Sequence, residues 1–89
     1  MSSESLLREQ AREAIRMGKL PSENPDRLWG GHGVNAVCVI CRRAVTRTQI
    51  EVAIEFARTG PMPGLDSYHL HLSCFAAWEF ERAQAGDEP

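Results

Sequence analysis

The sequence predicts a small α+β domain with an N-terminal helix, a β-hairpin and a C-terminal helix. Three observations lead to this fold class. Residues 4–17 carry apolar side chains at helical spacing, residues 49–56 alternate apolar and polar side chains, and residues 73–84 return to a helical pattern. The chain has 89 residues, of which 43% are hydrophobic and 25% are charged, which is the composition of one globular domain.

The N-terminal helix is predicted from an apolar arc and a boundary signal. Leu7, Ala11, Ala14 and Ile15 fall on one side of a helical wheel, and Gly18 suits the position just beyond the last turn. The arc is narrow and a row of arginines borders it, so we favour a helix laid over a small core. A helix that docks on a partner protein or on phosphates is the alternative.

The segment 19–37 is predicted to be irregular, because it holds two prolines and the run Gly30-Gly31-His32-Gly33. The run follows no predicted strand and opens no helix, which excludes a phosphate-binding glycine loop. We expect Trp29 to pack against the core and His32 to lie in a loop.

The hairpin is predicted from two alternating segments joined by a turn over residues 59–64, which are rich in glycine and proline. The second alternating segment covers residues 68–72, and a helix follows from about Ser73 to Gln84. The apolar positions of the first strand, which we expect in the core, are Ile50, Val52, Ile54 and Phe56.

Two pairs of metal-ligating residues carry the chemistry. Cys38 and Cys41 form a C-x2-C pair, and after 29 intervening residues His71 and Cys74 form an H-x2-C pair. Zinc is bound tetrahedrally by thiolate and imidazole, and two ligands separated by two residues reach one ion from a tight turn. Cys74 falls in the first turn of the final helix, where the helix dipole stabilises a thiolate. We therefore predict one structural Zn²⁺ ion per chain, whose four protein ligands leave no open position for catalysis.

Other roles of the cysteines stay open at this point. A C-x2-C pair is also found in thioredoxin-like redox motifs, although here it leads into a strand instead of opening a helix. Cys74 alone would fit a small buried hydrophobe. Three cysteines cannot all pair within one chain, which excludes a closed disulfide framework.

The fourth ligand is chosen between two histidines. His69 and His71 lie on the same face of a strand by the period of two. His71 has the x2 spacing to Cys74, so we predict that it is the ligand. We expect His69 to lie beside the ligands, where it supports them or serves as the alternative ligand.

Charge is distributed unevenly around a net charge of −2. Residues 1–47 hold eight Lys or Arg and five acidic residues, whereas residues 48–89 hold two Arg and seven acidic residues. Arg42, Arg43 and Arg47 follow the C-x2-C pair and are candidate contacts for nucleic acid. The basic excess is smaller than in dedicated nucleic-acid-binding proteins, so we rank nucleic acid below a protein partner.

The predicted order of C-x2-C turn, hairpin and helix is that of a treble-clef zinc finger. Residues 68–75, with His71, Cys74 and Phe75, resemble the H-x2-C-F segment of LIM domains and of the zinc fingers of poly(ADP-ribose) polymerases. This resemblance covers residues 38–75 and implies zinc ligation. The polymerase fingers bind DNA breaks, but this role is not expected here, because the C-terminal half of the chain is acidic. The whole chain also resembles small bacterial proteins with a C-x2-C pair, and this resemblance gives no information about an activity.

We predict a single domain over residues 1–89, with an N-terminal helix (1–18), an irregular segment (19–37), a zinc-binding core (38–84) and a frayed tail (85–89). A cytoplasmic location is expected, because no apolar run is long enough to span a bilayer and the start lacks signal-peptide features. The acidic residues form no nucleophile–base arrangement. We therefore expect a protein-interaction adaptor or regulator that is not an enzyme, with a nucleic-acid-binding zinc finger as the alternative.

Overall fold

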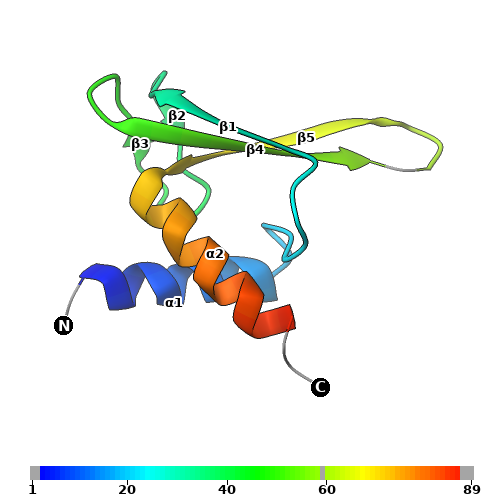
Figure 1. The fold of residues 1–89 in the computed structure, drawn as a ribbon, viewed down its shortest axis with the longest axis horizontal. Helices are drawn as coiled ribbons and strands as arrows, with labels where there is room; N and C mark the ends of the chain where they lie inside the picture. The colour runs from blue at the N-terminus through cyan, green and yellow to red at the C-terminus, as the bar shows by residue number, and fades with distance from the viewer. Residues whose placement is uncertain (1–2, 59, 87–89) are drawn as a thin grey trace.

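A three-stranded antiparallel sheet and two helices dominate the computed structural model, which has a small α+β fold (Figure 1). The structure describes residues 3–58 and 60–86. The elements in chain order are α1 (Ser3–Arg16), β1 (Arg27–His32), β2 (Ala36–Val37), β3 (Ala44–Val45), β4 (Ile50–Arg58), β5 (Gly64–His71) and α2 (Leu72–Gly86).

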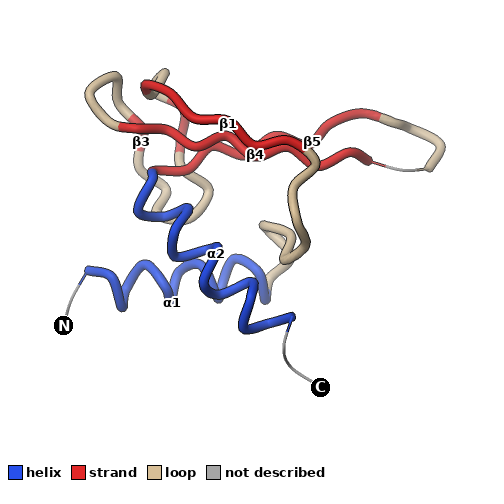
Figure 2. The backbone as a smooth tube through the Cα atoms, viewed as in Figure 1, coloured by secondary structure: helices blue, strands red, loops and turns tan. Residues whose placement is uncertain are grey.

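The central strand of the main sheet is β4, which pairs antiparallel with β1 on one side and with β5 on the other. The short strands β2 and β3 form a separate two-stranded ribbon. Both helices lie on the same side of the main sheet (Figure 2). Val52, Ile54 and Phe56 are buried, as the alternation of β4 predicts. Ile50 was predicted in the core but is 47% exposed, because it is the first residue of the strand, at the end of the sheet.

The core is centred on Trp78 of α2, which is fully buried. Its ring packs edge-on against Phe56, with 6.4 Å between the ring centroids. The indole Nε1–H donates a hydrogen bond to the carbonyl oxygen of Pro21 at 2.8 Å. This bond satisfies the polar atom of a buried ring and attaches the segment after α1 to α2.

The N-terminal helix packs on α2, which is the arrangement that the sequence favours. Ala11 and Ala14 are buried in the core, where their small side chains allow close approach. Arg12 donates from Nε to Oε1 of Glu81 at 2.9 Å, and Glu81 is only 6% exposed. This hydrogen bond raises the pKa of Arg12. Ala11 and Ala14 of the predicted apolar arc are therefore covered, whereas Leu7 and Ile15 are only partly buried.

The segment predicted to be irregular contains β1 and the two residues of β2, so that prediction was wrong for residues 27–32 and 36–37. The glycines of β1 make residues 27–32 resemble a turn in the sequence, and pairing with β4 holds these residues extended. Trp29 does not pack in the core: it is 61% exposed, because it lies on the face of the sheet opposite to the helices. His32 ends β1 and is not a loop residue.

Three predicted boundaries also differ. The second hairpin strand begins at Gly64, four residues earlier than predicted, within the expected turn; Thr59 of that turn lies outside the described residues. The final helix begins at Leu72, directly after β5. Of the predicted tail, residues 85–86 continue α2 and residues 87–89 lie outside the described residues. Within residues 3–58 and 60–86, neither helix has the length and apolar character needed to cross a membrane.

Gly33 occupies a position where a side chain does not fit. A Cβ atom there would lie 2.1 Å from the backbone oxygen of Thr46 and 2.3 Å from that of Val45. We expect Gly33→Ala to destabilise the fold by about 2–3 kcal/mol, because the backbone around β3 must move. Gly31→Ala is the matched control, since its Cβ would meet nothing within 4 Å, and we expect a change within about 0.5 kcal/mol. Chemical unfolding of dilute protein measures both, and equal stability of the two variants would contradict the prediction.

Candidate metal centre

The C-x2-C pair lies in the tight turn that joins β2 to β3. The N–H of Cys38 donates to the carbonyl oxygen of Arg43 at 2.8 Å, and the N–H of Arg42 donates to that of Cys38 at 3.0 Å. Arg42 has a φ of 68°, in the left-handed region that glycine enters more readily than other residues. The turn holds Cys38 and Cys41 close together, at the cost of strain at Arg42.

This turn is attached to the edge of β5. The N–H of Val39 donates to the carbonyl oxygen of His69 at 3.0 Å. Two residues later β5 passes into α2 with no intervening residue, so His71 ends the strand and Cys74 lies in the first turn of the helix. The backbone bond at Val39 thus places the C-x2-C pair beside the H-x2-C pair.

The structure brings the four predicted ligands together. The ligand atoms of Cys38, Cys41, His71 and Cys74 all lie within 4.8 Å of one another and could hold a metal ion. His71 Nδ1 is 3.3 Å from the Cys41 sulfur and 4.0 Å from the Cys74 sulfur. Around a tetrahedral zinc ion, ligand atoms stand about 3.5–3.8 Å apart, given Zn–S and Zn–N bonds of about 2.3 and 2.0 Å. The donor set fits such an ion with shifts of about 1 Å or less.

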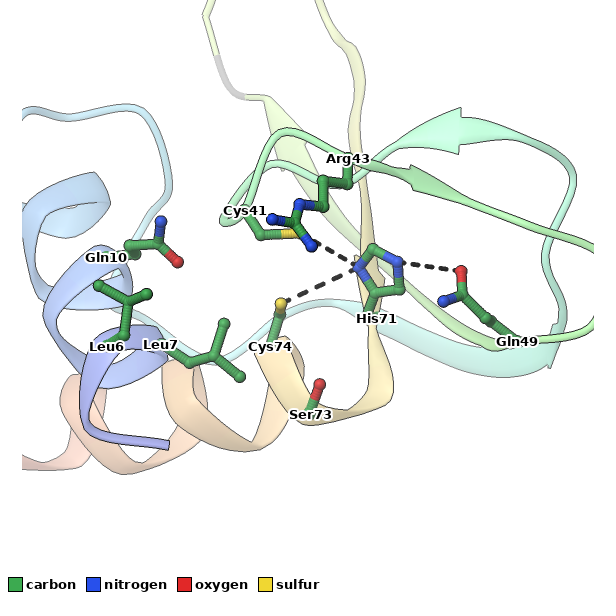
Figure 3. A pocket seen from close by; sticks show the side chains of 9 residues that line it. All are labelled: Leu6, Leu7, Gln10, Cys41, Arg43, Gln49, His71, Ser73 and Cys74. Atoms are coloured by element: carbon green, nitrogen blue, oxygen red, sulfur yellow. Dashed lines mark hydrogen bonds between the residues drawn. The ribbon is translucent and has the colours of Figure 1, made fainter. Parts of the chain in front are cut away.

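The ring of His71 is held in the tautomer that a metal ligand needs. Its Nε2 lies 3.1 Å from Oε1 of Gln49 and 3.2 Å from the carbonyl oxygen of Ala44. Both neighbours accept hydrogen bonds, so Nε2 carries the proton and the lone pair of Nδ1 faces the sulfurs. Figure 3 shows His71 between the two sulfurs of Cys41 and Cys74 on one side and Gln49 on the other.

Gln49 supports the site in a way that the sequence motif does not reveal. Its Oε1 also accepts a hydrogen bond from the backbone N–H of Thr46 at 2.9 Å, which fixes the orientation of the amide. The side chain therefore presents an oxygen, and not an NH₂ group, to His71. No spacing rule points to Gln49, because its place beside His71 depends on the register of β4 against β5.

His69 is not part of the four-residue group. Its Nδ1 lies 3.0 Å from Oε2 of Glu51, and its backbone oxygen accepts the hydrogen bond from Val39. The structure therefore gives no support to His69 as the alternative ligand, and the residue helps to attach the turn through its backbone. The rings of His69 and His71 have different partners, although a regular strand would place them on one face.

Two thiols of the cluster, those of Cys38 and Cys74, have shifted pKa values. The Cys38 thiolate accepts a hydrogen bond from the Cys74 thiol and further ones from backbone N–H groups, which together lower the pKa of Cys38 despite its burial. The same shared proton, with burial and the neighbouring Cys38 charge, raises the pKa of Cys74. A metal ion that binds both sulfurs must displace the Cys74 proton, so metal affinity falls as the pH is lowered.

A cavity of about 440 Å³ lies beside the cluster, and Cys41, His71 and Cys74 are among the residues that line it. The side chains that line it around the ligands include Arg43, Gln10 and Ser73 (Figure 3). Arg42, Arg43 and Arg47 are exposed, and among the described residues no carboxylate lies within 4.0 Å of any of the three. A cationic side chain is thus available next to a group of thiolates.

Comparison of the chain with protein-family models, with curated proteins and with solved structures found no match. The assignment of the site therefore depends on its own geometry.

Exchanging the two histidines for alanine separates their roles. We expect His71→Ala to weaken metal binding by more than about 100-fold, the upper range for residues that only support a ligand. His69→Ala keeps the backbone oxygen that bonds Val39, so we expect a loss of about tenfold or less. Competition titration with a chromophoric zinc chelator measures both. Equal losses would show that His71 is not the preferred ligand.

Gln49→Leu tests the hydrogen bond behind the ligand. The substitution keeps the approximate volume and removes the acceptor at Nε2 of His71, so we expect metal affinity to fall by about 10–100-fold. Gln10→Leu is the matched control, because Gln10 lines the same cavity but makes no hydrogen bond to His71. The same chelator competition reports the difference, and an unchanged affinity for Gln49→Leu would rule out this role.

Proposed function

We propose that the chain binds one Zn²⁺ ion through Cys38, Cys41, His71 and Cys74, and that this ion is structural. The observation that carries the proposal is the approach of three sulfurs and one imidazole nitrogen to within 4.8 Å. Thiolate and imidazole are the donors that zinc prefers in closed protein sites. The order of C-x2-C turn, β4–β5 hairpin and α2 further supports a treble-clef type of zinc finger.

A structural role is favoured over catalysis by the number of ligands. Four protein ligands complete a tetrahedron, whereas a catalytic zinc ion keeps one position for water or substrate. The ion would contribute folding free energy that a core of this size lacks, on the order of 10 kcal/mol for structural sites at neutral pH. We therefore propose a protein without enzymatic activity.

The surface around the helices supports a role as a protein-interaction adaptor or regulator. A cavity of about 320 Å³ lies between α1 and α2, with Leu7, Ala76 and Phe80 among the residues that line it. Leu6, Leu72 and Phe80 are large apolar side chains that stay exposed nearby. Apolar clefts with charged rims are typical of sites that receive a partner's side chains, and Arg8 and Glu4 line this cleft.

Elemental analysis and a paired substitution test the zinc site. We expect one zinc per chain in protein purified without chelator, and loss of the cooperative fold when Cys38→Ser removes a ligand. Val37→Ser is the matched control, because Val37 is the exposed neighbour of Cys38. Circular dichroism during thermal unfolding reports the fold. Metal-free protein that unfolds as cooperatively as the loaded form would overturn the proposal.

The adaptor role has a separate test. A Phe80→Glu variant should keep its zinc and its fold while losing a cross-linked partner that wild-type protein captures. Met62→Glu is the control, because Met62 is exposed on the β4–β5 turn, away from the cleft. Retention of the same partner by Phe80→Glu would place the interaction elsewhere.

Binding of nucleic acid is the second candidate function. The observation in its favour is a set of exposed arginines that have no carboxylate partner among residues 3–58 and 60–86, namely Arg42, Arg43 and Arg47. Contacts with phosphates weaken steeply with salt, so binding of labelled DNA or RNA should fall by at least about tenfold between about 50 and 200 mM salt. Absence of binding at the lower salt concentration would remove this candidate.

A further inference from the structure

The strand β1 is an open edge of the main sheet. It pairs with β4 along one side, and in the part of the chain that the structure describes no strand lies along its other side (Figure 1). All of its residues are exposed. An unpaired edge presents a row of backbone donors and acceptors to any strand that approaches.

The pairing with β4 determines which backbone groups of β1 face outward. The N–H of Gly33 donates to the carbonyl oxygen of Gln49 at 3.0 Å, in the same register as the rest of the pair. Along an antiparallel strand, residues alternate between those bonded to the partner and those directed away from it. The residues whose N–H and C=O groups are directed away from β4 are therefore Leu28, Gly30 and His32.

This edge lacks the usual protection against pairing. Natural sheets block exposed edges with lysine, proline or covering segments. No lysine or proline occurs between Arg27 and His32, and Leu28 and Trp29 are 52% and 61% exposed on opposite faces of the strand. Two large apolar side chains at an open edge favour contact with another chain.

The sequence of β1 is complementary to itself. When two copies pair antiparallel about Gly30, the outward-directed residues of one meet the outward-directed residues of the other. Trp29 of each copy then lies opposite Gly31 of the other copy. The space above Gly31 is open, since a Cβ atom there would meet nothing within 4 Å. An aromatic ring opposite a glycine covers backbone that is otherwise exposed.

We propose that the chain forms a twofold-symmetric dimer in which β1 pairs antiparallel with β1 of a second copy, centred on Gly30. The pairing joins the two main sheets into one. A second copy is the occupant that the observations favour, because every contact described above is made twice by the same residues, as an isologous interface requires. The proposal does not depend on the function proposed for the metal centre.

Sedimentation of the full chain, as purified without chelator, over a range of concentrations tests the oligomeric state. We expect a monomer–dimer equilibrium, and we expect Trp29→Lys to raise the dissociation constant by about 30-fold or more. Met62→Lys, at an exposed apolar residue far along the chain from β1, should leave it unchanged. A wild-type chain that stays monomeric, or a Trp29→Lys chain that dimerises equally well, overturns the proposal.

Amide hydrogen exchange followed by NMR tests the register without a substitution. In concentrated wild-type protein the amides of Leu28, Gly30 and His32 should be protected, and dilution should expose them. The amides of Gly31 and Gly33 should be protected at both concentrations, because they face β4. A dimer in which the first three amides exchange equally fast at both concentrations would show that another surface forms the contact.

Discussion

The direct passage of β5 into α2 is the constraint on which the metal centre depends. Because no loop separates strand and helix, His71 and Cys74 are three residues apart on a rigid bend and cannot move independently. The backbone bond from Val39 to His69 then positions the other ligand pair against this bend. A site assembled from two rigid pieces needs only their relative placement to be correct, which explains why all four donor atoms converge.

The core surrounds the same junction. Trp78 lies one helical turn beyond Cys74, and Cys38 and Cys74 are themselves fully buried beside it. The helix pair is held by small alanines and by the bond between Arg12 and Glu81, in which one carboxylate is nearly removed from water. Apolar burial and ligand geometry therefore stabilise the same part of the fold, and disturbing one disturbs the other.

The sequence carries the ligands and the hairpin in local patterns, and these are the parts that could be predicted. The spacing of Cys38 and Cys41, the alternation along β4 and the helical pattern of α2 need no knowledge of distant contacts. The strand β1 could not be predicted, because its glycines resemble a turn and its extended form comes from pairing with β4. The role of Gln49 could not be predicted for a related reason. It follows from the register between strands, which no residue spacing in the sequence reveals.

The separation between the two ligand pairs has a consequence for the unfolded chain. An ion held by Cys41 and His71 would close a loop of 29 intervening residues that contains the whole β4–β5 hairpin. Such a cross-link acts as a disulfide of the same span does, because it restricts the unfolded ensemble. In the loop-entropy description, this restriction stabilises the folded state by about 4 kcal/mol. Unlike a disulfide, it opens when the metal leaves or the thiolates are protonated. The metal ion would thus act as a reversible cross-link that can form in a reducing environment, where disulfides are rare.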